Sequence, residues 1–139
     1  MKIFAVIDTN VIVSALLSPL PDSSTVIIRD KIEDGTIVPL YSEEILREYK
    51  LVLSRPKFGF PECLVNELLE LIIHHGFSME RTKTEELFQD LSDIVFYEVA
   101  LSKDGSFLVT GNIKHFPKSP IVVTPAEMLK LLGDFLKTN

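Results

Sequence analysis

The stretch that decides the fold is Lys2-Ile-Phe-Ala-Val-Ile-Asp8-Thr9-Asn10. Residues 2–7 are mostly apolar and include β-branched and aromatic side chains, which predicts a buried strand. The pattern then changes to that of a helix over residues 10–17. Ligands of open parallel α/β sheets bind outside the carboxyl ends of the strands, so Asp8 is a candidate functional residue. The alternative is that Asp8 or Asn10 only caps the helix.

Strand-like and helix-like segments alternate through the rest of the sequence. Further strands are predicted at residues 37–41, 77–80, 106–110 and 121–124. Helices are predicted at residues 23–34, 42–55, 61–75, 90–101 and from 125 onward, with a helical or turn-like piece at 84–89. The last helix begins with a capping box, Thr124-Pro-Ala-Glu127. This alternation predicts a three-layer α/β/α domain around one parallel sheet.

Size and composition limit the class of protein. The 139 residues correspond to one domain, and a hydrophobic fraction of 46% can build a sizeable core. A net charge of -6 argues against a passive nucleic-acid binder, which needs a basic surface, but it is compatible with an enzyme whose acids hold metal ions. The single Cys63 excludes an internal disulfide, and its apolar helical surroundings predict a buried thiol. Without a signal peptide or an apolar run of about 18 residues, we expect a cytoplasmic protein with no membrane span.

Two acids in the predicted helices, Glu48 and Asp93, lie at positions where a structural role does not fully account for a carboxylate. Glu48 lies at the edge of an apolar stripe and four residues after Glu44, an unfavourable pair of like charges. Asp93 opens an apolar helix with Asp90 three residues before it, which is more negative charge than a cap requires. The alternatives are a solvated helix edge for Glu48 and plain capping for Asp90 and Asp93.

A second set of polar residues, Thr110-Gly-Asn112, follows a predicted strand as Asp8 does, although an ordinary turn is the alternative. If these two strands are neighbours, Asp8, Glu48 and Asp93 converge at one edge of the sheet. Convergent carboxylates repel one another, and their pKa values rise unless a cation binds between them. Oxygen ligands suit Mg²⁺ or Mn²⁺, which serve hydrolysis by activating water. The sequence therefore suggests a metal-dependent hydrolase.

Taken together, these segments resemble the PIN domain family over nearly the whole chain. The matching segments are Asp8-Thr9-Asn10, Ser42-Glu-Glu-Ile-Leu-Arg-Glu48-Tyr49, Asp90-Leu-Ser-Asp93, Leu108-Val-Thr110-Gly-Asn112 and Thr124-Pro-Ala-Glu127. The resemblance implies a sheet of order 3-2-1-4-5 and a Mg²⁺- or Mn²⁺-dependent ribonuclease that hydrolyses RNA phosphodiesters. The sequence is most similar to small prokaryotic PIN proteins assigned as toxins of toxin–antitoxin pairs, which implies an antitoxin partner and a homodimer.

The resemblance also assigns the site. The three family acids fall on Asp8, Glu48 and Asp93, which would act as metal ligands, and supporting polar residues fall on Asn10 and Thr110. The chain departs from the family at the fourth acidic position, because that position is an asparagine.

The asparagine at this fourth position is Asn112, which can offer a carbonyl oxygen to a metal but removes a charge. A second metal should therefore bind weakly. Asp90 is a candidate to supply the missing charge, and Glu44 is the alternative helix acid. Three loop residues are candidates to contact the RNA backbone, or are simply solvated: Lys103, Lys114 and His115.

Two other classes of function compete with the ribonuclease. The first is a PIN-fold module that binds RNA or protein and has lost catalysis, which Asn112 and the acidic composition favour. The second is a phosphatase-like or receiver-like α/β domain, which also gathers acids at strand ends. A receiver domain should have paired acids before the first helix and a lysine after a late strand, and neither is clear here.

Overall fold

Strand β1 (Ile3–Ile7) is the central strand of a five-stranded sheet in the computed structural model, which describes residues 2–88 and 90–137. The sheet order is β3-β2-β1-β4-β5, and every neighbouring pair is parallel. The other strands are β2 (Ile37–Tyr41), β3 (Phe77–Ser78), β4 (Phe107–Val109) and β5 (Val122–Val123). The predicted order 3-2-1-4-5 is confirmed.

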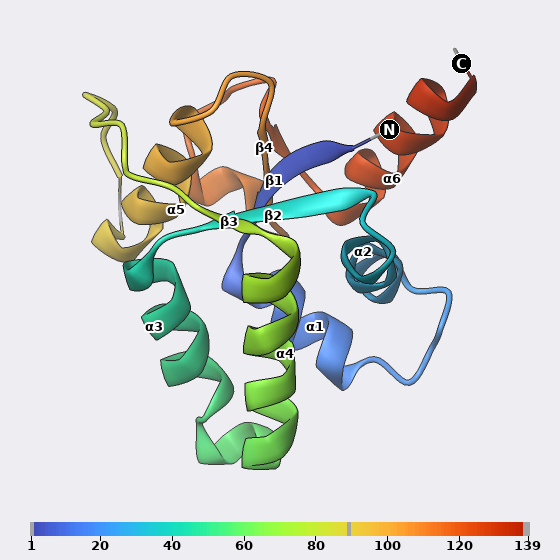
Figure 1. The fold of residues 1–139 in the computed structure, drawn as a ribbon. Helices are drawn as coiled ribbons and strands as arrows, with labels where there is room; N and C mark the ends of the chain where they lie inside the picture. The colour runs from blue at the N-terminus through green and yellow to red at the C-terminus, as the bar shows by residue number, and fades with distance from the viewer. Residues whose placement is uncertain (1, 89, 138–139) are drawn as a thin grey trace.

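Helices cover both faces of this sheet. The described helices are α1 (Thr9–Leu17), α2 (Ser24–Glu33), α3 (Glu43–Leu53), α4 (Glu62–His75), α5 (Leu91–Leu101) and α6 (Pro125–Lys137), with short 3-10 turns η1 (Pro56–Phe58) and η2 (Ile113–His115). Figure 1 shows α1, α3 and α4 on one side of the strands and α5 on the other, and α6 packs against α2. The three-layer α/β/α architecture is therefore confirmed.

The core forms where the apolar patterns of strands and helices meet. In β1, Ala5, Val6 and Ile7 are almost completely buried, as expected for a strand covered on both faces. Helix α3 turns Ile45, Tyr49 and Leu53 inward, one helical turn apart, and each is at most 1% exposed. Burial of these rows fixes α3 against the sheet and thereby fixes the direction of its polar edge.

The ends of two helices follow their predicted caps. The Ser42 hydroxyl accepts from the Ile45 amide at 3.2 Å and so begins α3. At α6, the Thr124 amide donates to the Glu127 carboxylate at 3.0 Å, and the Glu127 amide donates to the Thr124 hydroxyl at 3.1 Å. This reciprocal pair is the capping box that the sequence indicates.

Pro39 lies inside β2, where a missing amide should weaken the strand ladder. It pairs with Ala5 of β1 on one side, whereas β3 begins to pair only at Leu40. Gly76 lies against Pro39 just before β3, and a Cβ atom there would be 2.1 Å from the Pro39 carbonyl oxygen. Only glycine allows this close approach, so Gly76 lets β3 dock beside a strand that contains proline.

The expectation of a helical or turn-like piece at residues 84–89 is wrong over Thr84–Phe88, which has no regular structure; Gln89 lies outside the described residues. The physical reason is that tertiary contacts override the local helix propensity. The Thr82 amide donates to the Glu98 carbonyl at 3.1 Å, and the Thr84 amide donates to the Glu98 carboxylate at 2.7 Å. These bonds hold the start of the segment against α5.

The expectation of a buried Cys63 is also wrong, because the side chain is exposed. The inward row of α4 consists of Val65, Leu68 and Ile72. Cys63 precedes Val65 by two positions and therefore lies on the opposite side of the helix. The apolar composition of this helix did not reveal which of its faces is covered.

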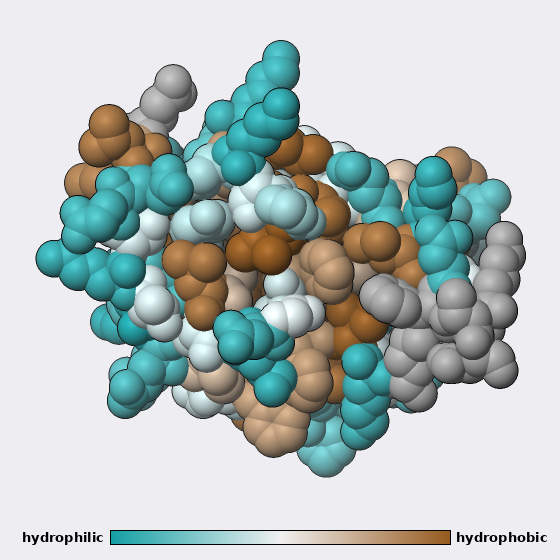
Figure 2. Space-filling view, turned by 90° about the horizontal axis from the view of Figure 1, so that it is seen from above, coloured by the Kyte–Doolittle hydropathy of each residue, from teal (hydrophilic) through white to brown (hydrophobic). Residues whose placement is uncertain are grey.

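Exposed apolar side chains are present but dispersed. Leu87 and Leu91, which are 96% and 75% exposed, flank the start of α5. Figure 2 shows that apolar areas on the face viewed from above are separated by hydrophilic side chains. Within the described residues, no helix has the length and apolar character needed to cross a bilayer.

Glu98 anchors the irregular segment before α5. It is only 4% exposed, and it pairs with the Arg81 guanidinium at 2.6 Å. Arg81 also reaches Glu44 of α3 at 2.9 Å, so one guanidinium links α3 to α5. Burial tends to raise the pKa of Glu98, but the Thr84 amide and Arg81 outweigh burial and hold this pKa below its usual value.

We expect Glu98→Gln to lower the free energy of unfolding by about 1–3 kcal/mol at pH 7, because Arg81 loses its buried charged partner. Since the folded pKa of Glu98 is below the unfolded value, the stabilisation is present above the unfolded pKa and is lost as pH falls through the folded pKa. Urea unfolding at pH 7 and pH 3.5 should show this difference shrinking in acid. Glu44→Gln, on the exposed arm of the same guanidinium, should cost less than about 1 kcal/mol. Equal stability of Glu98→Gln and wild type at pH 7 would contradict this role.

Candidate active site

Asp8 lies where β1 ends and α1 begins. Its Oδ1 atom accepts from the Thr9 amide at 2.8 Å, so the carboxylate caps α1, as the alternative prediction held. Its Oδ2 atom accepts from Asn10 Nδ2 at 3.1 Å and from Thr110 Oγ1 at 2.7 Å. The side chain is 7% exposed, and burial raises its pKa in spite of these bonds. Asp8 is therefore both a cap and the centre of a polar network.

The sheet register brings the second polar motif to this network. Ile7 pairs with Val109, which places Thr110 beside Asp8 at the carboxyl edge of the sheet. Asn10 Oδ1 accepts from the Gly111 amide at 3.1 Å and Thr110 Oγ1 accepts from the Asn112 amide at 3.0 Å. The predicted meeting of the two strand ends is confirmed. The Asn112 residue itself is exposed at the start of η2.

Asp93 lies in the first turn of α5 on the other side of the sheet edge. Its side chain is 15% exposed, and its buried Oδ2 atom has no hydrogen-bond partner among the described residues. The nearest basic side-chain nitrogen among the described residues is His115 Nδ1 at 3.6 Å, which is too long for a hydrogen bond. Burial and the charges of Asp8 and Asp90 raise the pKa of Asp93 to about 6.

The remaining acids divide into two kinds. Asp90 caps α5 as the alternative prediction held, and the bonds that it accepts from the Ser92 hydroxyl at 2.7 Å and the Ser92 amide at 2.9 Å lower its pKa. Glu44, the alternative helix acid, is paired with Arg81. Glu48 is half-buried on α3, and its charge contributes to the raised pKa of Asp93. Asp8 and Glu48 therefore both lie within electrostatic reach of Asp93.

Tyr49, in the inward row of α3, also supports the site, although no role there was predicted for it from the sequence. The Tyr49 hydroxyl donates to the carbonyl of Ile7, the residue directly before Asp8. Burial, followed by the charge of Asp8, raises the pKa of Tyr49. The residue is adjacent to Glu48 in α3, so one helix both holds the end of β1 and brings a carboxylate toward it. No local sequence signal identifies the partner of a buried hydroxyl.

The loop cations are distributed over two edges of the sheet. Lys114 and His115 lie in η2, beside the acids. The prediction that Lys103 flanks the site is wrong, because it precedes β4 and its ammonium lies 4.3 Å from the ring centroid of Phe4. Phe4 is in the first half of β1, away from its carboxyl end. Lys103 does lie in a loop, as the sequence predicted, but this loop is at the amino end of β4.

The donors at this edge suit a hard cation. Carboxylate oxygens are offered by Asp8, Glu48 and Asp93. The Oδ2 atom of Asp93 has no hydrogen-bond partner among the described residues, so a bound cation would stabilise its negative charge. Within residues 2–88 and 90–137, no three His, Cys, Asp or Glu side chains are grouped closely enough to enclose a metal ion. Mg²⁺ commonly uses only one or two protein carboxylates and completes its shell with water and substrate phosphates. The residues therefore fit an open site rather than a closed protein cage.

The family model described as PIN domain matches residues 5–114, which include the Asp8, Glu48, Asp93 and Asn112 positions. No protein in the curated set matches the chain.

Proposed function

Because the chain belongs to the PIN domain family, which has a nuclease fold, we propose that it is a metal-dependent endoribonuclease that hydrolyses RNA phosphodiesters. The observation that carries this proposal is the pair of acids, buried Asp8 and partly buried Asp93, at the carboxyl edge of the central strands. Both have raised pKa values, chiefly because of burial, and repulsion by the charge of Asp8 adds to the raised pKa of Asp93. Such repulsion destabilises the folded protein, and acids arranged in this way are typical of catalytic or binding sites.

Asp8 and Asp93 would hold Mg²⁺ or Mn²⁺, with Glu48 contributing directly or through water. Such a cation, when bound, polarises the phosphate and lowers the pKa of an attacking water. Asn10 and Thr110 fix the direction of the Asp8 carboxylate through its Oδ2 atom. This fixed orientation is what a supporting shell provides for a metal-binding carboxylate.

A PIN-fold binding module without catalysis is the second candidate. It is favoured by Asn112, which replaces an acid expected from the family resemblance, and by the acidic composition of the chain. Such a module would still present the basic and polar residues of η2 to RNA.

The proposal is tested by incubating the protein with a mixed pool of structured and single-stranded RNA in Mn²⁺, Mg²⁺ or EDTA. We expect internal cleavage with a divalent cation and none with EDTA. Circular dichroism and thermal melting of the same samples establish that the protein is folded. No cleavage with either cation by folded protein would reject the enzyme and favour the binding module. Release of phosphate from small esters, without RNA cleavage, would instead favour a phosphatase.

We also propose a biological role from the resemblance stated above, namely a homodimeric toxin restrained by an antitoxin protein. The exposed Leu87 and Leu91 beside α5 offer apolar surface close to the acids. Light scattering should give the mass of a dimer at working concentration, and a monomer would remove that part of the proposal. Co-purification with the product of the neighbouring gene, and inhibition by it, would test the antitoxin.

A further inference from the structure

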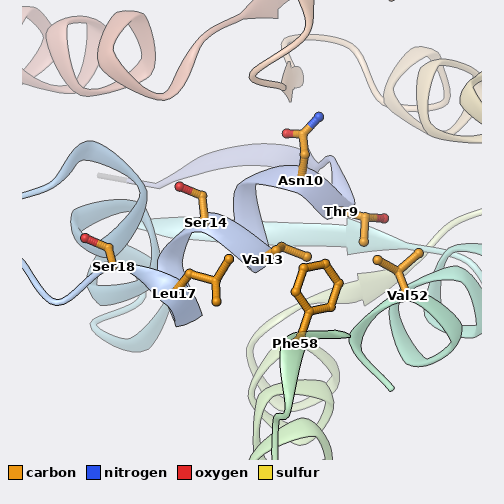
Figure 3. Close-up of a pocket in the computed structure, with 8 residues that line it drawn as sticks. All are labelled: Thr9, Asn10, Val13, Ser14, Leu17, Ser18, Val52 and Phe58. Atoms are coloured by element: carbon orange, nitrogen blue, oxygen red, sulfur yellow. The ribbon is translucent and has the colours of Figure 1, made fainter. Parts of the chain in front are cut away.

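A groove of about 460 Å³ lies beside the acids, between α1 on one side and α3 and η1 on the other. Its apolar wall includes Val13, Val52 and Phe58, and Figure 3 shows the Val13 side chain and the Phe58 ring next to each other in this wall. A volume of this size is within the range of sites for small ligands. The groove is open to solvent along the exposed side of α1.

The groove is continuous with the candidate active site through Asn10. This residue lines one end of the groove, and its amide is also bound to Asp8 and Gly111. Thr9 lies at the same end, and its buried hydroxyl has no hydrogen-bond partner among the described residues. A ligand part in the groove would therefore lie next to a phosphate bound to the cation that Asp8 would hold.

An aromatic and basic cluster adjoins the groove at Phe58, which lines it. Phe58 is partly exposed and stacks on Phe60 with a centroid distance of 5.4 Å. The Lys57 ammonium lies 5.1 Å from the Phe58 ring centroid, and Arg55 begins the same turn. Both cations are exposed, and neither forms an ion pair with a carboxylate of the described residues. In a chain of net charge -6, this local positive charge favours an anionic ligand.

We propose that this groove holds the base of a nucleotide next to the phosphodiester that is cut in single-stranded RNA. The inference rests on the proposed ribonuclease function and adds to it a binding site for one base. An aromatic ring beside cations is the combination that binds unpaired bases and their backbone. A base inside a duplex is stacked on its neighbours and cannot enter such a groove. Because the wall is mainly apolar, binding depends on stacking and tolerates different bases.

The first experiment measures coupling between Phe58 and one base. Wild type and Phe58→Ala cleave single-stranded RNAs in which one abasic nucleotide is moved along the strand. We expect an abasic nucleotide beside the cut to lower wild-type kcat/KM about tenfold, and Phe58→Ala to lower it by a similar factor on intact RNA. The two losses should not add, because both remove the same stacking contact. Phe77→Ala, which removes an exposed ring on β3, should behave as wild type.

The second experiment keeps the inference testable if no cleavage is observed. A short single-stranded RNA containing 2-aminopurine is titrated with protein in EDTA, because stacking on a ring quenches its fluorescence. Quenching by wild type and Phe77→Ala, but not by Phe58→Ala, supports the groove even without an enzyme. Lys57→Gln should weaken binding at every probe position and reduce the salt dependence. The inference would be overturned if the losses caused by Phe58→Ala and by the abasic nucleotide were additive, or if wild type did not quench the fluorescence. The groove would then be a candidate site for a protein partner.

Discussion

Asp8→Asn is expected to reduce metal-dependent RNA cleavage by at least about a hundredfold, because changing even a supporting residue of a metal site commonly costs about 10–100-fold. The substitution replaces the negative Oδ2 atom, on which Asn10 and Thr110 converge, with a neutral group. It also removes one of the two buried charges that a cation would neutralise. The loss should appear in kcat/KM and should not be recovered by raising Mn²⁺ within a range that saturates wild type.

The same substitution should leave the fold intact. An asparagine at position 8 keeps an oxygen that accepts from the Thr9 amide, so the cap of α1 survives. Its amide nitrogen meets the Nδ2 donor of Asn10, and this lost hydrogen bond costs about 1 kcal/mol. Removing a charge whose ionisation is penalised by burial offsets part of that cost. The melting temperature should therefore change by only a few degrees.

Asp104→Asn is the matched control, since it makes the same chemical change in an exposed turn before β4, away from the carboxyl ends of the strands. It should cleave RNA as fast as wild type. Full cleavage by folded Asp8→Asn would show that the chemistry lies elsewhere. Loss of folding in Asp8→Asn would assign the residue a structural role that its three hydrogen bonds do not predict.

The features of the fold and of the site that could be predicted from the sequence are those that depend on a short run of neighbouring residues. The strand before Asp8, the cap at Asp90 and the capping box at Thr124 each depend on a few consecutive residues, and each was correct. The neighbouring positions of β1 and β4 followed from the family resemblance and the alternation of elements. The meeting of Asp8 with Thr110 needed no further information.

Features that depend on contacts between distant segments were not predictable. Arg81 joins Glu44 to Glu98 across three segments of the chain, and nothing near any of them in sequence indicates this link. The Tyr49 hydroxyl finds the Ile7 carbonyl only after α3 has packed on the sheet. Cys63 and Lys103 were misplaced for the same reason, because the face of a helix and the edge of a sheet are set by the whole fold.

Asp93→Asn is expected to have two opposite effects, which separate stability from activity. The folded pKa of Asp93, about 6, is above its ordinary value of 3.8. Between these two pH values the folded protein binds more protons than the unfolded chain, so stability falls as pH rises from about 4 to about 6. Above that range, ionised Asp93 remains repelled by Asp8 and Asp90 in the metal-free protein. Removing its charge should then raise the free energy of unfolding by about 1–3 kcal/mol at pH 7.5.

The measurement is thermal or urea unfolding of wild type and Asp93→Asn in EDTA, from pH 4 to pH 8. The variant should be more stable above pH 6, and the difference should vanish near pH 4, where Asp93 is protonated. Asp90→Asn is the stability control, because asparagine caps a helix as well as aspartate does and the exposed Asp90 has a lowered pKa. It should not show the gain in stability above pH 6 that is expected of Asp93→Asn, because the ionised form of Asp90 is favoured in the folded protein.

Adding Mn²⁺ at pH 7.5 completes the argument. A cation that binds the folded state stabilises it by mass action, so the melting temperature of wild type should rise with Mn²⁺. Asp93→Asn lacks a carboxylate for that ion, so it should respond weakly and should lose at least about a hundredfold in RNA cleavage. The acid that destabilises the metal-free protein would then be the one that activity requires, a trade-off expected of functional sites. An Asp93→Asn protein that is less stable than wild type at pH 7.5, or equally stabilised by Mn²⁺, would show that this carboxylate is structural.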